Sequence, residues 1–240
     1  MSIPKRIIQT HKNADIHVEH RRTWIAHNPE FEYLFFDDAG CERFIGQHFP
    51  EFLPTYDKLP LKAQKADFFR YLAIYRLGGI YADVDTICMA PVAGYLDLES
   101  VDLAIGIEMT ADVYRQGPRK YLQEYLAPRQ FSQWTFAAAA GHPMLAALMQ
   151  SIHQSVAQLS QARLVELSGL PRFVLELTGP IAFTQAVQFY TAFHPSQAIQ
   201  VLPQLYWGYS PWHNTGVNPR QNGDVKLVHL FHGSWRKPNP

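Results

Sequence analysis

Near the start of the chain, the pattern of apolar and polar residues changes between one typical of strands and one typical of helices. Short β-rich runs at Arg6–Thr10 and Phe31–Phe36 predict buried strands. Between them, Val18–Ala26 is rich in helix formers, and Asn28-Pro29 ends this helix because a residue before proline is disfavoured in helical geometry. The pattern therefore predicts a β-α-β unit.

A second helix is expected at Leu61–Leu77, where small and apolar residues recur at three- and four-residue steps and Gly78-Gly79 can end the helix in left-handed geometry. The period then changes, and Ile80–Asp85 is expected to be a strand. Side chains two apart on a strand point the same way, so Asp83 and Asp85 are predicted to share one face.

The remaining elements predict one mixed α/β domain. Before the second helix, Asp37 or Asp38 can cap a further helix that runs through Gln47. Beyond the Asp-Val-Asp segment, strands are expected at Val101–Ile107 and Lys226–Phe231, and helices at Pro143–Leu159 and from Thr178-Gly179-Pro180 through Tyr190. Asp112–Pro128 and Gly208–Asp224 are rich in turn residues, and no repeat or linker divides the chain.

Composition narrows the class of protein. The 240 residues are 47% hydrophobic, and 21 Lys and Arg balance 21 Asp and Glu, so no basic field favours nucleic acid or an anionic membrane. Cys41 and Cys88 are too few for a disulfide framework. The chain shows neither a signal peptide nor a long uncharged apolar run. We expect a soluble protein of a reducing compartment.

Asp83 and Asp85 are the first candidates for chemistry. Paired carboxylates at a strand end can hold Mg²⁺ or Mn²⁺, and such an ion can bridge a diphosphate. Asp67 and Arg70 lie three residues apart on one face of the preceding helix. The tight Gly78-Gly79 connection is expected to bring these four charged groups into one crevice at the strand ends.

The segment HLFHGSW at residues 229–235 is the third candidate. A neutral imidazole is a good ligand for a divalent ion, and a hydroxyl or an indole N–H can donate to a phosphate. His229 and His232 would face opposite sides of a strand, so one of the two is expected to reach the metal, and the pattern leaves open which one.

The order of short motifs resembles the glycosyltransferases with the DXD sugar-binding region, a family of fungal mannosyltransferases, inositolphosphoceramide sugar transferases and small bacterial enzymes. The resemblance rests on IPKRIIQT at residues 3–10, ADFFRY at 66–71, YRLGGIYADVD at 75–85, RQFSQWT at 129–135, GHP at 141–143, TGP at 178–180 and the closing HLFHGSW. It spans nearly the whole chain, and its QWT, GHP and TGP motifs are most similar to the fungal enzymes that initiate α-1,6-mannose outer chains.

The resemblance implies a GT-A fold with a Rossmann-like mixed sheet flanked by helices, and retaining transfer of a hexose. It places Asp83 at the donor sugar or ribose and Asp85 on the metal, with His229 as a further ligand. It implies that the donor hexose is bound by Asp67 and Arg70, the nucleotide by the strand end at Gln9 and Thr10, and the diphosphate by Ser234 and Trp235. His11 stands where many relatives have Trp or Tyr.

The implied cofactors are Mn²⁺ or Mg²⁺ and a nucleotide-sugar donor, GDP-mannose or a UDP-hexose, and the implied acceptor is a saccharide or a lipid-linked glycan. Residues 1–110 would form the nucleotide-sugar half and residues 111–240 the acceptor half of a single domain. Without an anchor in the chain, the expected location is cytoplasmic, or peripheral at the inner membrane face. Trp24 and Trp134 are expected to be buried structural residues.

Three alternatives stay open. The first is a toxin-like transferase that glycosylates a protein. The second is a non-catalytic carbohydrate-binding module, suggested by five Trp and twelve Tyr. The third, a Mg²⁺-dependent phosphatase with an aspartate nucleophile, also uses a DxD motif, but on the first strand of its sheet, whereas here a β-α pair precedes the motif.

Overall fold

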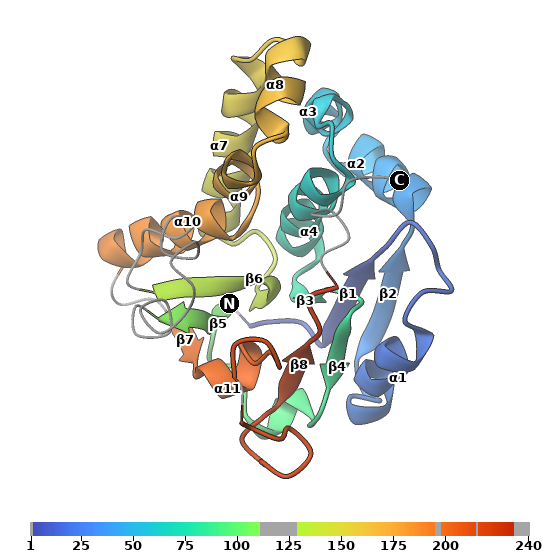
Figure 1. The fold of residues 1–240 in the computed structure, drawn as a ribbon, viewed down its shortest axis with the longest axis vertical. Helices are drawn as coiled ribbons and strands as arrows, with labels where there is room; N and C mark the ends of the chain where they lie inside the picture. The colour runs from blue at the N-terminus through green and yellow to red at the C-terminus, as the bar shows by residue number, and fades with distance from the viewer. Residues whose placement is uncertain (1, 111–128, 195–197, 215, 233–240) are drawn as a thin grey trace.

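A computed structural model describes residues 2–110, 129–194, 198–214 and 216–232 (Figure 1). Within these residues a six-stranded mixed sheet has the order β2-β1-β3-β6-β5-β7, in which β6 is antiparallel to both neighbours. A second sheet pairs β4 with β8 in antiparallel fashion. The strands are β1 (Arg6–Thr10), β2 (Glu32–Phe36), β3 (Gly79–Ala82), β4 (Thr86–Cys88), β5 (Leu103–Thr110), β6 (Arg129–Ala138), β7 (Ile199–Leu202) and β8 (Leu227–His229).

Helices cover both faces of the large sheet. They are α1 (Val18–His27), α2 (Asp38–His48), α3 (Leu53–Lys58), α4 (Lys62–Leu77), α7 (Pro143–Ala157), α8 (Gln161–Ser168), α9 (Pro171–Leu177), α10 (Pro180–Phe193) and α11 (Gln204–Trp207), with 3₁₀ turns η1 (Pro50–Phe52) and η2 (Val92–Gly94). Figure 1 shows α4 and α7 on one side of the sheet and α1, α11 and the β4–β8 pair on the other. The architecture is therefore three-layered.

Successive side chains along a strand point to opposite faces of the large sheet, so the hydrophobic core has two parts. Ile8 of β1 and Tyr81 of β3 pack with α2, α4, α7 and α10 in the larger hydrophobic cluster. Their neighbours Ile7 and Ile80 point the other way and pack with Trp24 of α1 in the second cluster. A strand that is buried on both faces needs apolar residues at successive positions, and β1 and β3 have them.

The predicted β-α-β unit is confirmed, with β1 parallel to β2 and α1 between them. The helix that follows β2 is also confirmed, and Asp37 is its cap, because its side chain accepts the backbone N–H of Gly40 at 2.6 Å. The Pro143 helix is capped by His142, whose Nδ1 accepts the N–H of Met144 at 3.3 Å. The GHP motif therefore has a structural role at the start of α7.

The strands β3 and β6 differ from the expectations. The expected strand at Ile80–Asp85 ends at Ala82, and Asp83–Asp85 form a turn into β4. The backbone N–H of Thr86 donates to the carbonyl oxygen of Asp83 at 3.2 Å and closes this turn. The strand β6 was not predicted, because it is buried at nine consecutive positions that include four polar residues and so has no two-residue alternation.

Both cysteines are free and buried. Among the described residues, no helix has both the length and the apolar character needed to cross a bilayer.

Gly78 forms the tight connection between α4 and β3. Its φ of 65° is left-handed, and an added Cβ would lie 2.7 Å from Cδ of Pro4 and 2.8 Å from the backbone nitrogen of Ala140. We expect Gly78→Ala to lower the free energy of unfolding by about 1–3 kcal/mol, measured by urea denaturation. Gly94→Ala is the control, because its added Cβ meets nothing within 4 Å. Equal stability of the two variants would contradict this account.

Candidate active site

The turn after β3 presents the Asp-Val-Asp segment at the junction of the two sheets. Three parts of the chain hold its backbone in place. The Nε2 of Gln9, in β1, donates to the carbonyl oxygen of Asp83 at 3.1 Å, and the Oγ1 of Thr86 donates to the same oxygen at 2.5 Å. The backbone N–H of Leu230 donates to the carbonyl oxygen of Asp85 at 3.1 Å. Both carboxylates therefore project from a backbone with little freedom.

Asp83, Asp85 and His229 form a candidate metal centre. One ligand atom from each residue can be chosen so that all three lie within 4.8 Å of one another. His229 arrives from the far end of the sequence because β8 pairs with β4 in the register that places His229 opposite Thr86. Two carboxylates and one imidazole suit Mn²⁺ or Mg²⁺ and leave positions for oxygens of a ligand.

His229 and His232 contact Asp85 in different ways. The Nε2 of His229 lies 3.2 Å from Oδ1 of Asp85, and the His229 side chain is buried. His232 is exposed and meets Asp85 through its backbone N–H, which donates to Oδ2 at 3.0 Å. The structure therefore places the His229 imidazole, and not that of His232, with the two carboxylates.

The two aspartates differ in acidity. Burial raises the pKa of Asp83, and the positive charge of Arg70 only partly opposes this effect. Burial also acts to raise the pKa of Asp85, but hydrogen bonding and charge from His229 outweigh it and hold the pKa below its ordinary value. Asp85 is thus ionised at neutral pH and ready to bind a cation.

Asp67 and Arg70 lie directly behind the metal centre. The Nη2 of Arg70 is 3.0 Å from Oδ1 of Asp67 and 3.2 Å from Oδ1 of Asp83, so one guanidinium joins both carboxylates. Only 5% of the Arg70 side chain and 8% of the Asp67 side chain are exposed, compared with 27% for Asp83. Burial raises the pKa of Asp67 to about 6, although Arg70 opposes the shift. The four charged groups predicted to share a crevice are close together, but Asp67 and Arg70 are enclosed.

Gln133 and Thr178 complete this network. The Nε2 of Gln133 donates to Oδ1 of Asp67 at 2.9 Å, while its Oε1 and its backbone carbonyl accept from Nη1 of Arg70. The Oγ1 of Thr178 donates to Oδ2 of Asp67 at 3.0 Å. In the sequence, both residues stand within the QWT and TGP motifs, without a role of their own. Their positions in these motifs are the signal that pointed to them.

Two aromatic residues support the candidate ligands. The hydroxyl of Tyr81 donates to Oδ1 of Asp83 at 2.8 Å, and the Arg70 guanidinium lies over its ring at 4.6 Å. Burial raises the pKa of Tyr81 and keeps this hydroxyl protonated. The ring of Trp134 lies 4.2 Å from that of His229 and its Nε1 donates to Glu108 at 3.2 Å. Tyr81 and Glu108 were not among the predicted site residues.

The other predicted residues have different surroundings. Trp24 and Trp134 are buried, as expected, and the indole N–H of Trp24 donates to Oγ1 of Thr86 at 3.0 Å. The hydroxyl of Thr10 faces the carbonyl of Phe36 rather than the carboxylates. Ser234 and Trp235 lie outside the described residues.

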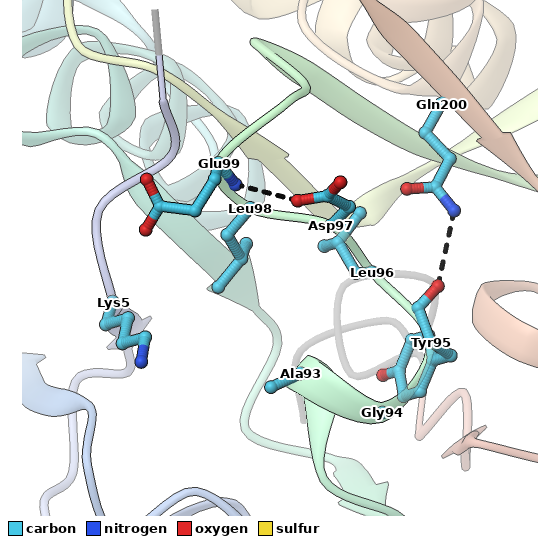
Figure 2. A pocket seen from close by; sticks show the side chains of 9 residues that line it. All are labelled: Lys5, Ala93, Gly94, Tyr95, Leu96, Asp97, Leu98, Glu99 and Gln200. Carbon is cyan, nitrogen blue, oxygen red and sulfur yellow. Dashed lines mark hydrogen bonds between the residues drawn. The ribbon is translucent and has the colours of Figure 1, made fainter.

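A separate pocket near the surface contains none of these residues. Figure 2 shows it between the Ala93–Glu99 segment, Lys5 and Gln200, where Gln200 donates to the carbonyl oxygen of Tyr95 at 3.2 Å. Its volume is about 480 Å³. The candidate site is therefore defined by the carboxylate–imidazole cluster and not by this cavity.

Comparison with known proteins identifies relatives of the chain. The sequence model of the family described as "Glycosyltransferase sugar-binding region containing DXD motif" matches residues 15–102. The chain is 32% identical over 242 residues to an initiation-specific alpha-1,6-mannosyltransferase of Schizosaccharomyces pombe, covering 94% of this chain and 56% of that protein. For the Candida albicans protein of the same name, identity is 31%, over 87% of this chain and 57% of the relative. The chain spans a little over half the length of these relatives.

Solved structures agree on the fold. The PaToxG glycosyltransferase has a TM-score of 0.55 at 18% identity, covering 80% of this chain and 71% of its own. The ligand-free glycosyltransferase domain of the YGT toxin has a TM-score of 0.53 at 9% identity, with 83% and 80% covered. These matches show a fold of the GT-A type. The chain belongs to the family whose sugar-binding region contains the DXD motif.

Variants at Thr178 test whether the buried hydrogen bonds of Asp67 stabilise the fold. Thr178→Val keeps the shape of the side chain but leaves Oδ2 of the buried Asp67 without its hydrogen bond. We expect this variant to lose about 1.5–3 kcal/mol of unfolding free energy, measured by urea denaturation. Thr178→Ser keeps the hydroxyl and should retain most of the stability. A serine variant as unstable as the valine variant would show that packing of the methyl group, and not the hydrogen bond, matters here.

Proposed function

We propose that the chain is a metal-dependent, retaining hexosyltransferase that moves a hexose from a nucleotide-sugar donor to a saccharide or lipid-linked acceptor. The observation that carries this proposal is the convergence of Asp83, Asp85 and His229. Mannose is the favoured sugar, because the two fungal relatives described above are named as alpha-1,6-mannosyltransferases. A cytoplasmic location, free or at the inner membrane face, belongs to the same proposal.

Asp83, Asp85 and His229 would hold Mn²⁺ or Mg²⁺. When bound, such an ion neutralises negative charge on the diphosphate that leaves the sugar. Asp85 is ionised in advance, and its two oxygens are oriented by the His229 imidazole and the His232 backbone. A ligand set held in this way needs little rearrangement to bind a cation.

Asp83 is also the carboxylate best placed for the donor sugar. Transfer develops positive charge at the anomeric carbon, and a nearby carboxylate stabilises that charge. Asp83 is partly exposed, and its Oδ1 is oriented by the Tyr81 hydroxyl and the Arg70 guanidinium. Because Asp67 and Arg70 are almost fully buried, we assign them chiefly to positioning Asp83 and propose that they also hydrogen-bond the donor hexose.

Other parts of the chain are proposed to contact the nucleotide, the diphosphate and the acceptor. Gln9 contacts the backbone of Asp83 and marks the nucleotide side of the site. Ser234 and Trp235 are proposed to bind the diphosphate. Residues 1–110 would contribute most donor contacts, and residues 111–240 those to the acceptor.

Asp85 provides the test of this function. With a panel of GDP-mannose, UDP-glucose, UDP-galactose, UDP-GlcNAc and GDP-fucose, release of the nucleoside diphosphate is measured with Mn²⁺ and with chelator, water serving as acceptor. We expect one donor to be turned over only with metal, and Asp85→Asn to lower that rate by at least about 100-fold, equivalent to about 2.7 kcal/mol. Because Asp85 also accepts hydrogen bonds from His229 and from the His232 backbone, the folded fraction is measured by thermal unfolding, and the loss of turnover should exceed any loss of folded protein.

Asp97→Asn is the matched control. Asp97 is an exposed aspartate in a turn of the separate pocket, where it accepts backbone N–H groups of Glu99 and Ser100. Its substitution should leave metal-dependent turnover unchanged. Full activity of Asp85→Asn, or turnover that survives the chelator, would refute the metal assignment.

A further inference from the structure

Three histidines gather beside the DXD turn without belonging to the candidate metal centre. The Nε2 of His17 and the Nδ1 of His232 are 3.1 Å apart, although the residues are separated by 215 positions in sequence. The ring of His20 stacks on that of His17, with centroids 5.0 Å apart and planes at 9°. We call His17, His20 and His232 the imidazole cluster. It joins the start of α1 to the segment after β8.

The backbone is strained where this cluster forms. Among the described residues, the non-glycine residues with positive φ are His17, at 48°, and Phe231, at 47°. Left-handed geometry is unfavourable for a residue with a Cβ. Phe231 directly precedes His232. Each of the two segments that bring the paired imidazoles together therefore contains a residue in an unfavourable backbone conformation. Strain of this kind persists where the surrounding structure holds it, often at functional sites.

Helix capping does not explain the position of His17. It is the N-cap residue of α1, but its side chain makes no capping hydrogen bond. Its imidazole is directed at His232 instead. The Nδ1 of His20 is buried and has no hydrogen-bond partner among the described residues. Helix formation therefore leaves both imidazoles available for another use.

The separation of the two nitrogens matches a shared transition-metal ion. Nitrogens bound at about 2.05 Å and separated by 3.1 Å subtend an angle of about 98° at the ion, between octahedral and tetrahedral values. We propose that His17 and His232 form a second metal site, which takes a borderline divalent ion such as Zn²⁺ or Ni²⁺. Water completes the coordination, with His20 as the nearest further imidazole. Imidazole pairs favour such ions, whereas the carboxylate-rich centre favours Mg²⁺ or Mn²⁺.

An ion at this site fixes the segment after β8 to the N-terminus of α1. The backbone N–H of His232 already donates to Oδ2 of Asp85 at 3.0 Å, so the second site lies against the first. Its occupation stabilises the position of the segment that carries His229. The assignment depends on the imidazole geometry alone and is independent of the proposed transferase reaction.

Calorimetry with Zn²⁺ alone, in a non-coordinating buffer and without any nucleotide sugar, tests this proposal. The wild-type chain is expected to bind one equivalent that depends on His17 and His232. His17→Gln and His232→Gln should each weaken that equivalent by at least about tenfold, since even indirect supporting groups contribute this much. Zn²⁺ should also raise the unfolding temperature of the wild type more than that of either variant.

Two further variants complete the design. His27→Gln is the matched control, because His27 lies at the other end of the same helix, outside the cluster. It should bind Zn²⁺ as the wild type does. Asp83→Asn should retain the His17-dependent equivalent while weakening Mn²⁺ binding. The proposal is overturned if wild-type protein binds no Zn²⁺, if both glutamine variants bind it unchanged, or if the only equivalent is lost in Asp83→Asn. Those results would leave a simple hydrogen bond between the imidazoles.

Discussion

The guanidinium of Arg70 lies where distant parts of the chain meet. It bridges Asp67, on its own helix, and Asp83, in the turn after β3, and it donates to Gln133 of β6. Through Asp67 the network reaches Thr178, just before α10. Removing one partner of a buried ion pair costs about 3–5 kcal/mol, because the other charge is left without compensation. One buried cation therefore fixes the relative positions of α4, β3, β6 and α10.

Buried hydrogen bonds stabilise the fold together with the hydrophobic core. The strand β6 carries Gln130, Ser132, Gln133 and Thr135 in buried positions. Each of these has a specific partner, including the hydrogen bond from Oγ1 of Thr135 to the carbonyl of Tyr81 at 3.0 Å. Buried polar groups stabilise a fold only when they are satisfied. The centre of the sheet is thus specified by hydrogen bonds around the site, and its outer layers by apolar packing.

Local signals in the sequence predicted much of this arrangement. Caps, glycines and three- to four-residue periodicity located β1, α1, α2 and α4, because these signals act within a few residues. The fold class also followed from the order of motifs. The contacts of Gln133 and Thr178 span 66 and 111 residues, and no local pattern encodes such a pairing. The choice between His229 and His232 likewise depended on the pairing of β4 with β8.

The turn at Asp83–Asp85 shows how a function can interrupt a regular pattern. The continuous apolar run before it is that of a buried strand, but the strand ends at Ala82 and the chain turns through Asp83–Asp85 into β4. A continuous strand would have carried the carboxylates along the sheet, whereas the turn directs them toward β8.

The pairing of β4 with β8 also has a consequence for synthesis. Thr86 and His229 lie opposite each other in this small sheet, yet they are translated 143 residues apart. Asp83 and Asp85 emerge from the ribosome long before their imidazole partner, so the nascent chain carries the two acidic side chains without His229. The three-residue centre can assemble only after β8 has been released from the exit tunnel.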